Sequence, residues 1–405
     1  MNVLFLTVGH IDDIEERTIY CDLLRCFLKH GHSVYALSPG KKEIQRLSCF
    51  GGKDNCVIAH VDIDMMRGGK NIIKKGLSTL QVSKKYIKSI KNGFSNVVFD
   101  LVLYSTPPIT FNKAVEFVKK RDNVRTYLLL KDIFPQNAVD LGMMKTSGLK
   151  GFIYRYFRKT EKKLYLLSDT IGCMSQANMD YVIGNNPEID PSNVEICPNS
   201  IEVVEKRVSK ADRQAIREKY GIPSDKVAFI YGGNLGKPQD IPFVIKCLKA
   251  CEGEDRACFV VVGDGTEYRT LDDYQTNSGQ KNFKLIRKIP KEEYDMLVGA
   301  CDVGLIFLDH RFTIPNFPSR LLSYMQVGIP VLACTDTSSD IGKVIVDAGF
   351  GWWCESNDEN AFAMTVNDAI NQYSDPDMYK RETDYLNTYY SVETAYRIIT
   401  GTSSE

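Results

Sequence analysis

Short apolar strands alternate with amphipathic helical segments along the whole chain, and this alternation limits the fold more than any other feature. Each half opens in the same way, with an apolar run, a glycine-containing turn and a helical segment: VLFLTVGH at 3–10 and VAFIYGGNLG at 227–236. Repeated strand–helix alternation is typical of parallel sheets covered by helices. The sequence therefore predicts two α/β domains, each a doubly wound parallel sheet, that face each other across a cleft at the carboxyl ends of their strands.

The chain is long enough for two domains, and its charge differs between the halves. With 405 residues it exceeds the size at which one hydrophobic core stops growing. Residues 1–200 carry 28 Lys and Arg against 20 Asp and Glu, whereas residues 201–405 carry 23 against 31. We predict a first domain over 1–200, a second over 201–375, and a Tyr-rich helical tail over 376–405 that crosses back to the first. The charge asymmetry indicates different partners for the two domains.

Cysteine, histidine and hydropathy patterns exclude several classes of protein. The twelve cysteines form no Cys-x-x-Cys pair, and the 43% of hydrophobic residues is that of an ordinary globular protein. Only His30 and His32 lie close together, on either side of a glycine, so we expect no metal site. The chain opens on an apolar strand without a basic leader, and no apolar run reaches the ~18 residues of a spanning helix. These features predict a cytoplasmic protein with reduced thiols and no cofactor.

A glycine-rich turn follows the strand that opens the second half. The run GGNLGK (232–237) precedes a helical segment that begins at about residue 241. Glycines let a ligand approach the backbone, a helix N-terminus attracts anions, and a lysine adds positive charge. The spacing fits neither GxGxxG nor GxxxxGK[ST], so a plain strand-end turn is the alternative. Our candidates for phosphate binding are Gly233, Asn234, Gly236 and Lys237.

Two further turns stand at expected strand ends. Asp264 lies between two glycines in VVVGDGTE (260–267), and Ile289 lies in the turn RKIP (287–290). Backbone at such a turn is able to read the edge of a nucleobase, which makes both residues candidates for nucleotide contacts. A tight turn is the alternative for Asp264, and a plain connection is the alternative for Ile289.

The stretch PNFPSRLLSYMQVGIPVL (315–332) places an arginine where a polar loop becomes a helix. Prolines stiffen the loop, the first amides of the helix are free, and the planar guanidinium of Arg320 suits phosphate oxygens. Anion binding by Arg320 and by the amides of Phe317 and Ser319 is the economical interpretation. In the alternative, Arg320 pairs with Asp309 or Asp340 and has a structural role.

The order of these motifs resembles a known family over nearly the whole chain. The second half resembles the nucleotide-sugar domain of retaining family 4 glycosyltransferases of the GT-B fold. The motifs that carry this resemblance are, in order, the strand with GGNLG, VVVGDGTE, KIPKEEYDMLVGACDVGLIFL and PSRLLSYMQVGIPVLA. LLLKDIFPQNAVDLGMM and EKKLYLLSDTIGCMSQANMDYV in the first half resemble the bacterial surface-polysaccharide branch, whose members include O-antigen and capsule amino-sugar transferases. The resemblance implies a nucleotide-sugar donor in the second domain, an acceptor in the first and retention of configuration. With Arg320, Lys237 and loop amides to stabilise the departing diphosphate, no metal would be required.

One departure from the family concerns the donor. The resemblance places two glutamates, eight positions apart, where this chain has Pro315 and Ser323. The second glutamate usually holds the donor ribose, whereas Ser323 offers only a neutral hydrogen bond. Arg320 stands at the basic position of the branch's Pro-Ser-Lys/Arg variant, which favours the phosphate role.

The first domain offers its own candidates at strand ends. Asp132, in KDIFPQ, stands near the place where the family often has a histidine that lines the sugar site. Its carboxylate would orient or deprotonate an acceptor hydroxyl, or would cap the next helix instead. Gly9 and His10 follow the first strand, and we expect Arg17 to begin a helix that runs from about Glu15 to His30. These three residues are candidates for contacts to acceptor or donor phosphate.

Two basic segments of the first domain predict contact with an anionic membrane. Between residues 65 and 98 there are eight Lys and Arg and no acidic residue, and KGFIYRYFRKTEKKLY (150–165) mixes cations with aromatic residues. Each cation near anionic lipid contributes roughly 1 kcal/mol, although a solvated helix face is the alternative. Nucleic acid is not expected, because no nucleic-acid module is recognised. The membrane candidates are Lys74, Lys75, Lys84, Lys85, Arg155 and Arg158.

Together these features predict a glycosyltransferase that moves a sugar from a nucleotide diphosphate, with UDP favoured, to a lipid-linked glycan at the inner face of the cell membrane. Asp132, Arg320 and Lys237 would carry the chemistry, because stabilisation of the departing diphosphate is the main electrostatic contribution available. The alternatives are a non-catalytic nucleotide-sugar-binding or assembly partner and a UDP-GlcNAc epimerase of the same architecture.

Overall fold

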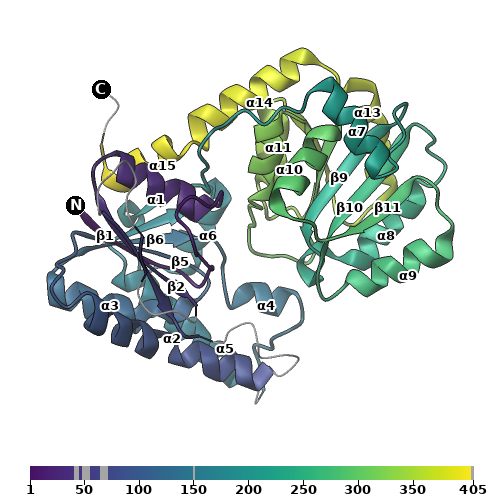
Figure 1. The fold of residues 1–405 in the computed structure, drawn as a ribbon. Helices are drawn as coiled ribbons and strands as arrows, with labels where there is room; N and C mark the ends of the chain where they lie inside the picture. The colour runs from purple at the N-terminus through teal and green to yellow at the C-terminus, as the bar shows by residue number, and fades with distance from the viewer. Residues whose placement is uncertain (41–44, 48–54, 64–71, 149–150, 403–405) are drawn as a thin grey trace. The chain divides into compact units, whose positions relative to one another are not determined.

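The computed structural model describes residues 1–402 except 41–44, 48–54, 64–71 and 149–150 (Figure 1). The chain forms two compact units: Met1–Glu202 together with Ser391–Glu405, and Val203–Tyr390. The expected tail over 376–405 is divided between them at Tyr390. Both units are parallel-sheet α/β domains, in agreement with the strand–helix alternation of the sequence.

The first unit contains an eight-stranded sheet in the order β3-β4-β2-β1-β5-β6-β7-β8. Every neighbouring pair is parallel except β3 and β4, which are antiparallel. The strand order reverses beside β1, as in other doubly wound sheets. The strands are β1 (Asn2–Leu6), β2 (Ser33–Pro39), β3 (Gln45–Leu47), β4 (Cys56–Val61), β5 (Leu101–Ser105), β6 (Arg125–Leu130), β7 (Thr170–Cys173) and β8 (Val194–Ile196).

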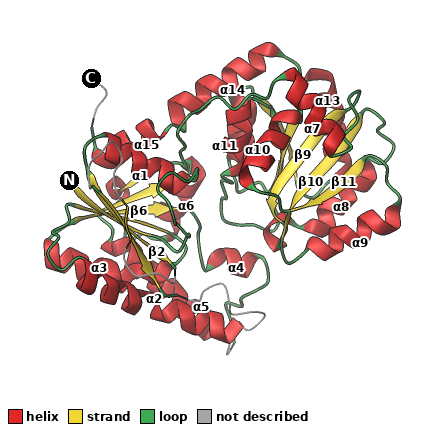
Figure 2. Ribbon diagram, in the orientation of Figure 1, coloured by secondary structure: helices red, strands yellow, loops and turns green. Residues whose placement is uncertain are grey.

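Helices cover the first sheet (Figure 2). The first helix starts later than the expected Glu15, because Thr18 caps it by accepting a hydrogen bond from the amide of Cys21. Arg17 therefore precedes this helix instead of beginning it. The helices are α1 (Ile19–Lys29), α2 (Ile72–Gly93), α3 (Asn112–Asp122), α4 (Gln136–Asp140), α5 (Gly151–Leu167), α6 (Gln176–Asn185) and α15 (Val392–Thr400).

The last helix of the chain belongs to the first unit. α15 packs against α1, and Figure 1 shows the yellow helix beside the purple one. Tyr396 and Ile399 are buried in the same hydrophobic cluster as Phe27. A single β-bridge between Ile201 and Ser391 joins the two segments where they enter this unit.

The second unit is a six-stranded, wholly parallel sheet in the order β11-β10-β9-β12-β13-β14. Buried strands with apolar residues on both faces build its core, in which the rings of Phe229 and Phe259 stack 5.2 Å apart. The strands are β9 (Val227–Asn234), β10 (Ala257–Asp264), β11 (Phe283–Arg287), β12 (Val303–Phe307), β13 (Val331–Thr335) and β14 (Gly351–Glu355).

Two groups of helices flank this second sheet. α7, α10 and α11 pack together on one side, whereas α8 contacts α9 and α13 on the other (Figure 2). In the described part of the chain, no helix is both long and apolar enough to cross a bilayer. The helices are α7 (Lys210–Lys219), α8 (Ile241–Ala250), α9 (Tyr268–Ser278), α10 (Lys291–Ala300), α11 (Arg320–Val327), α12 (Ile341–Asp347), α13 (Glu359–Gln372) and α14 (Pro376–Tyr389).

Candidate functional site

The carboxyl edge of the second sheet gathers most of the predicted donor residues. β9 and β10 are paired along their whole length, so that Gly233 lies opposite Gly263 and Asn234 opposite Asp264. The amide of Leu235 donates to the carbonyl of Asp264 at 3.0 Å, which joins the two turns. The loop after β12 leads to α11 at the same edge, where parallel α/β sheets bind their ligands.

Arg320 is the first residue of α11, and its side chain folds over the end of β9. The guanidinium carbon lies 4.2 Å from the centre of the Tyr231 ring. Nη1 is buried and has no hydrogen-bond partner among the described residues. A buried donor without a partner costs about 1–3 kcal/mol, more when it is charged, so native proteins rarely keep one without a function. The unpaired Nη1 therefore indicates that Arg320 lacks a hydrogen-bond acceptor that a ligand would supply.

The alternative role for Arg320, an ion pair with Asp309, does not occur in the structure. Asp309 is fully buried and accepts instead from Arg311, with a distance of 2.9 Å from Nε to Oδ1. No ion pair joins Arg320 to any carboxylate of the described residues. The guanidinium therefore keeps its charge without an acidic neighbour to neutralise it.

Three tyrosines surround this guanidinium. Burial lowers the pKa of Arg320, but the nearby hydroxyls, first that of Tyr231, raise it more, and the net shift is upward. Burial in turn raises the pKa values of Tyr231, Tyr294 and Tyr324, so all three phenols stay neutral at physiological pH. The hydroxyl of Tyr294 is also buried without a partner. The surroundings of Arg320 therefore combine one permanent cation with neutral phenol groups.

The paired glycines of the GGNLG turn make space for these side chains. Gly233 has φ +136°, a left-handed conformation that favours glycine, and a Cβ there would lie 3.4 Å from Nη2 of Arg320. A Cβ on Gly232 would lie only 1.9 Å from the hydroxyl of Tyr294. Gly232 is therefore needed for the packing of Tyr294, and Gly233 for the backbone conformation of the turn.

The amino end of α11 adds free backbone donors. The amides of Phe317, Ser319 and Arg320 make no hydrogen bond within the described part of the chain, and Ser319 does not cap the helix with its side chain. The loop is held from behind, because the amide of Asn316 donates to Oγ of Ser339 at 2.8 Å. Ser323 lies one turn after Arg320 and is half-buried. These groups are arranged to receive an anion.

Other predicted donor residues are arranged differently from the expectation. The amide of Gly236 is not free, because it donates to Oε1 of Gln239 at 3.2 Å. Asp264 is exposed and accepts from the amide of Gly265 at 2.8 Å, which is the bond of a tight turn. Lys237 is exposed at the start of a short 3-10 helix. Ile289 lies half-buried in the turn after β11, beyond Asp264 on the sheet edge.

In the first unit, Asp132 follows β6 at the carboxyl edge. Both carboxylate oxygens accept from Nδ2 of Asn137, at 2.8 and 2.9 Å. Burial raises the pKa of Asp132 to about 6, and the hydrogen bond from Asn137 opposes this shift. Asp132 does not cap α4, whose capping position is occupied by Pro135. Lys131, which sequence reasoning missed, lines a small cavity beside it, and burial lowers its pKa to about 8.

The loop after β1 is held by internal bonds. The amide of Gly9 donates to Oγ1 of Thr7 at 2.9 Å. His10 contacts the carbonyl of Pro39 through Nδ1 and the carboxylate of Asp12 through Nε2. The pKa of His10 is raised, first by the bond to Pro39.

Arg17, the third residue predicted to contact phosphate in this part of the chain, already has an acidic partner. Arg17 forms an ion pair with Glu202. Arg25 and Lys29 contact the same carboxylate, so Glu202 is the centre of a basic cluster. The guanidinium of Arg17 is thus less available for a phosphate than the sequence suggested.

Residues 212–384 match the family model of glycosyl transferases group 1. This segment is a glycosyl transferases group 1 domain. The match spans most of the second unit and includes the GGNLG turn, Arg320 and the whole of α11. The resemblance predicted from the motif order is therefore confirmed at the level of a glycosyltransferase.

Known proteins agree with the group 1 domain in sequence and in fold. The chain is 24% identical over 305 residues to Pseudomonas aeruginosa "Probable glycosyltransferase WbjE", with 75% of this chain and 74% of that protein covered. It is 22% identical to WcaI of Escherichia coli, named as a colanic acid biosynthesis glycosyl transferase, over 60% of each chain. The structure of HepE from Anabaena in complex with UDP superposes with a TM-score of 0.68, at 14% identity and over 99% of each chain. The predicted GT-B fold is confirmed by such neighbours.

The basic residues outside the group 1 domain do not form a uniform surface. Arg155 is exposed and lies 4.5 Å from the ring of Phe152. Arg158 is half-buried and bonds Glu161 at 2.7 Å and the side-chain oxygen of Asn186 at 2.6 Å, so it joins α5 to α6. Arg158 therefore has a packing role that the sequence did not indicate.

The predicted lysines of α2 also differ from one another. Lys84 is exposed, whereas Lys85 donates to the carbonyl of Asp62 at 2.5 Å. The side chains of Lys74 and Lys75 lie outside the described residues. Only part of the proposed basic face is therefore visible in the structure.

Proposed function

We propose that the chain transfers a sugar from a nucleotide diphosphate donor, with UDP as the nucleotide, to a lipid-linked glycan in the synthesis of a surface polysaccharide. The glycosyltransferase family supports the reaction class. The fold neighbour that binds UDP supports the nucleotide, and the relative named for colanic acid biosynthesis supports the polysaccharide.

The observation that carries the donor proposal is the unpaired Nη1 of Arg320. A diphosphate supplies the anionic oxygens that this buried nitrogen lacks, and charge-assisted bonds of this kind are about twice as strong as neutral ones. The free amides of Phe317 and Ser319 are further donors to the same anion. Lys237 is exposed near this edge and adds a second positive charge. These groups bind the diphosphate in the ground state and stabilise it more as it leaves.

We propose that the leaving group needs no metal, because a guanidinium, an ammonium and backbone amides supply the countercharge. Ser323 would give the donor ribose a neutral hydrogen bond in place of the family's glutamate. The turn at Asp264 and the backbone at Ile289 would contact the nucleoside. Retention of configuration follows only from the family resemblance.

Asp132 is our candidate for the acceptor hydroxyl. With a pKa of about 6 it is mostly ionised at neutral pH yet basic enough to accept a proton. Nδ2 of Asn137 holds both carboxylate oxygens, so the group is oriented before the acceptor arrives. We assign it the role of orienting or deprotonating the hydroxyl that attacks the sugar.

The lipid-linked acceptor would be reached through α5, which we propose lies on the anionic inner face of the cell membrane. Phe152, Ile153 and Tyr156 expose 67%, 54% and 50% of their surface, which is unusual for large apolar residues on one helix. Arg155 and Lys159 are exposed on the same helix. Apolar side chains beside cations are typical of helices that lie in a membrane interface.

Titration calorimetry with UDP, GDP and dTDP tests the donor assignment. We expect UDP to bind most tightly and chelation by EDTA to leave its affinity unchanged. Binding of none of the three would reject the donor proposal, and loss of UDP binding in EDTA would reject the metal-free mechanism. Incubation of a UDP-sugar with soluble or lipid-linked acceptors then separates a transferase from an epimerase, which acts on the donor alone.

Sedimentation with phosphatidylglycerol vesicles tests the membrane face. Replacement of Phe152 and Ile153 by serine should release the protein, whereas Met364→Ser, an equally exposed position on α13, should not. Equal sedimentation of the two variants would reject the membrane proposal and indicate that α5 is an ordinary solvent-exposed helix.

A further inference from the structure

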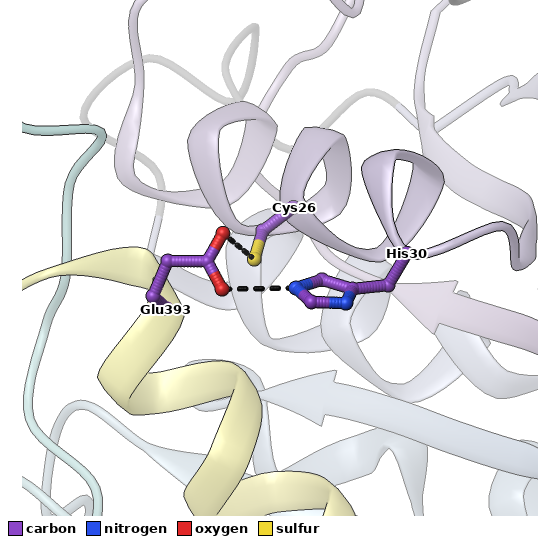
Figure 3. Close-up of side chains that lie close together, drawn as sticks. All are labelled: Cys26, His30 and Glu393. Carbon is purple, nitrogen blue, oxygen red and sulfur yellow. Dashed lines mark hydrogen bonds and ion pairs between the residues drawn. The ribbon is translucent and has the colours of Figure 1, made fainter. Parts of the chain in front are cut away.

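A thiol, an imidazole and a carboxylate meet where the first and last helices of the chain pack together (Figure 3). Cys26 lies on α1 and His30, four positions later, is the C-cap residue of that helix, so both side chains lie near the same face. Glu393 lies on α15 and points between them (Figure 3). Its Oε1 is 3.5 Å from the sulfur of Cys26, and its Oε2 is 2.9 Å from Nε2 of His30.

The three donor atoms are spaced as they would be around one ion. All lie within 4.8 Å of one another. With Zn–S of about 2.3 Å and Zn–O of about 2.0 Å, tetrahedral geometry places sulfur and oxygen about 3.5 Å apart. The observed separation of Oε1 and Sγ is 3.5 Å. If Oε1 is the ligating oxygen, Nε2 of His30 has to lie about 3.3 Å from Oε1, and its present bond of 2.9 Å to Oε2 gives way to the bond with the ion.

The surroundings of the cluster fix its ligands and leave it accessible. The ring of His30 stacks on Tyr396 at 4.0 Å with 6° between the planes, which restricts its rotation. The side chains of His30 and Glu393 are 40% and 53% exposed, whereas Cys26 is buried. An ion would therefore reach the thiol from the solvent side, and water would occupy the fourth position.

We propose that Cys26, His30 and Glu393 bind a divalent ion of the zinc type and thereby fasten the last helix of the chain to the first. Soft thiolate together with imidazole selects Zn²⁺ over the oxygen-preferring Mg²⁺ and Ca²⁺. The thiol loses its proton to solvent when it ligates, so one proton leaves for each ion bound. The bound ion stabilises the folded first unit, because the site exists only when α15 is docked on α1.

A second cluster in the chain does not have this chemistry. Asp240, Asp309 and His310 also approach one another, but they include no thiol. Asp309 is engaged by Arg311, and Nδ1 of His310 is 3.9 Å from Asp240. This cluster carries no proposal, yet it supplies an internal control for ion binding.

Cobalt titration of the full, metal-free chain tests the proposal, because thiolate ligation to Co²⁺ gives a charge-transfer band in the near ultraviolet. We expect one Co²⁺ per chain with this band in the wild type and in His310→Ala. Cys26→Ser should lose the band. His30→Ala and Glu393→Gln should weaken binding by at least roughly tenfold, on the scale of disrupted metal sites. Zn²⁺ should displace the Co²⁺ and abolish the band.

Absence of the band in the wild type, or equal binding by Glu393→Gln, would overturn the proposal and leave the cluster as a hydrogen-bonded contact. Cys26 is buried, so its replacement also tests packing, whereas His30 and Glu393 are partly exposed and their variants keep the test decisive. UDP binding is measured separately in the second unit. Failure of the ion site would therefore leave the donor proposal intact, and the reverse also holds.

Discussion

Replacement of Arg320 by methionine should separate a ligand-binding role from a structural one. Methionine keeps an apolar stem against Tyr231 but removes the charge and the unpaired Nη1. Each lost charge-assisted bond to a diphosphate weakens binding by about 1.5–3 kcal/mol, which corresponds to roughly 10- to 150-fold in affinity. We therefore expect titration calorimetry to show at least a tenfold loss of UDP affinity.

The same substitution should change stability little. Removal of an unpaired buried donor relieves about 1–3 kcal/mol, while loss of the cation–π contact with Tyr231 costs about 0.5–2 kcal/mol. The net change in the free energy of unfolding should stay within about 2 kcal/mol of zero. Loss of one partner of a buried ion pair costs about 3–5 kcal/mol instead. Urea unfolding distinguishes these values, and the fluorescence of Trp352 and Trp353, the two tryptophans of the chain, reports on the second unit.

Arg311→Met is the matched control. Arg311 lies in the same loop, but it pairs with the fully buried Asp309, so its removal leaves a carboxylate without its partner. We expect this variant to lose stability with little change in UDP affinity. If Arg320→Met destabilises the second unit by 3 kcal/mol or more and keeps its UDP affinity, the proposed role of Arg320 is refuted.

Three other substitutions test groups elsewhere. Glu382 is fully buried without a partner, and burial raises its pKa well above the ordinary value, so the folded state disfavours its ionised form. In urea unfolding at pH 8, Glu382→Gln should therefore be more stable than the wild type. This difference in stability should close as the pH falls toward the ordinary pKa of about 4.5, and a difference that does not change with pH would contradict the prediction. If the carboxylate form of Asp132 acts, the transfer rate of the wild type should rise as the pH increases through about 6. Asp132→Asn should be much slower and should not show this pH dependence. The same pH–rate profile in the variant and the wild type would exclude Asp132. Gly232→Ala should lose UDP affinity and about 1–3 kcal/mol of stability by overpacking against Tyr294, whereas Gly184→Ala, with open space around its Cβ, should bind UDP normally.

The sequence was most informative where local pattern and fold class decide the structure. Strand–helix alternation predicted the two parallel sheets, and GGNLG marked the end of β9. A strand of three residues such as β3 leaves too few positions for a period-2 pattern to be recognised.

The site depends on contacts between distant segments, which one sequence does not reveal. Arg158 was expected at a membrane surface, but it donates to the side chain of Asn186 at the end of α6. Tyr294, which packs against Gly232, comes from α10 and carries no motif of its own. In each case a side chain that the local pattern does not specify decides the environment.

The docking of α15 on α1 sets an order for biosynthesis. The apolar side of α1, which includes Phe27, is covered by Tyr396 and Ile399 of α15. α15 follows the whole second unit in the sequence, so the first unit cannot complete its hydrophobic core until Val203–Tyr390 has been synthesised. The second unit, by contrast, is one continuous segment, Val203–Tyr390, and all of its residues have been synthesised before α15 emerges. In nascent chains the second unit would therefore be able to fold first, and it would become protease-resistant before the first unit does.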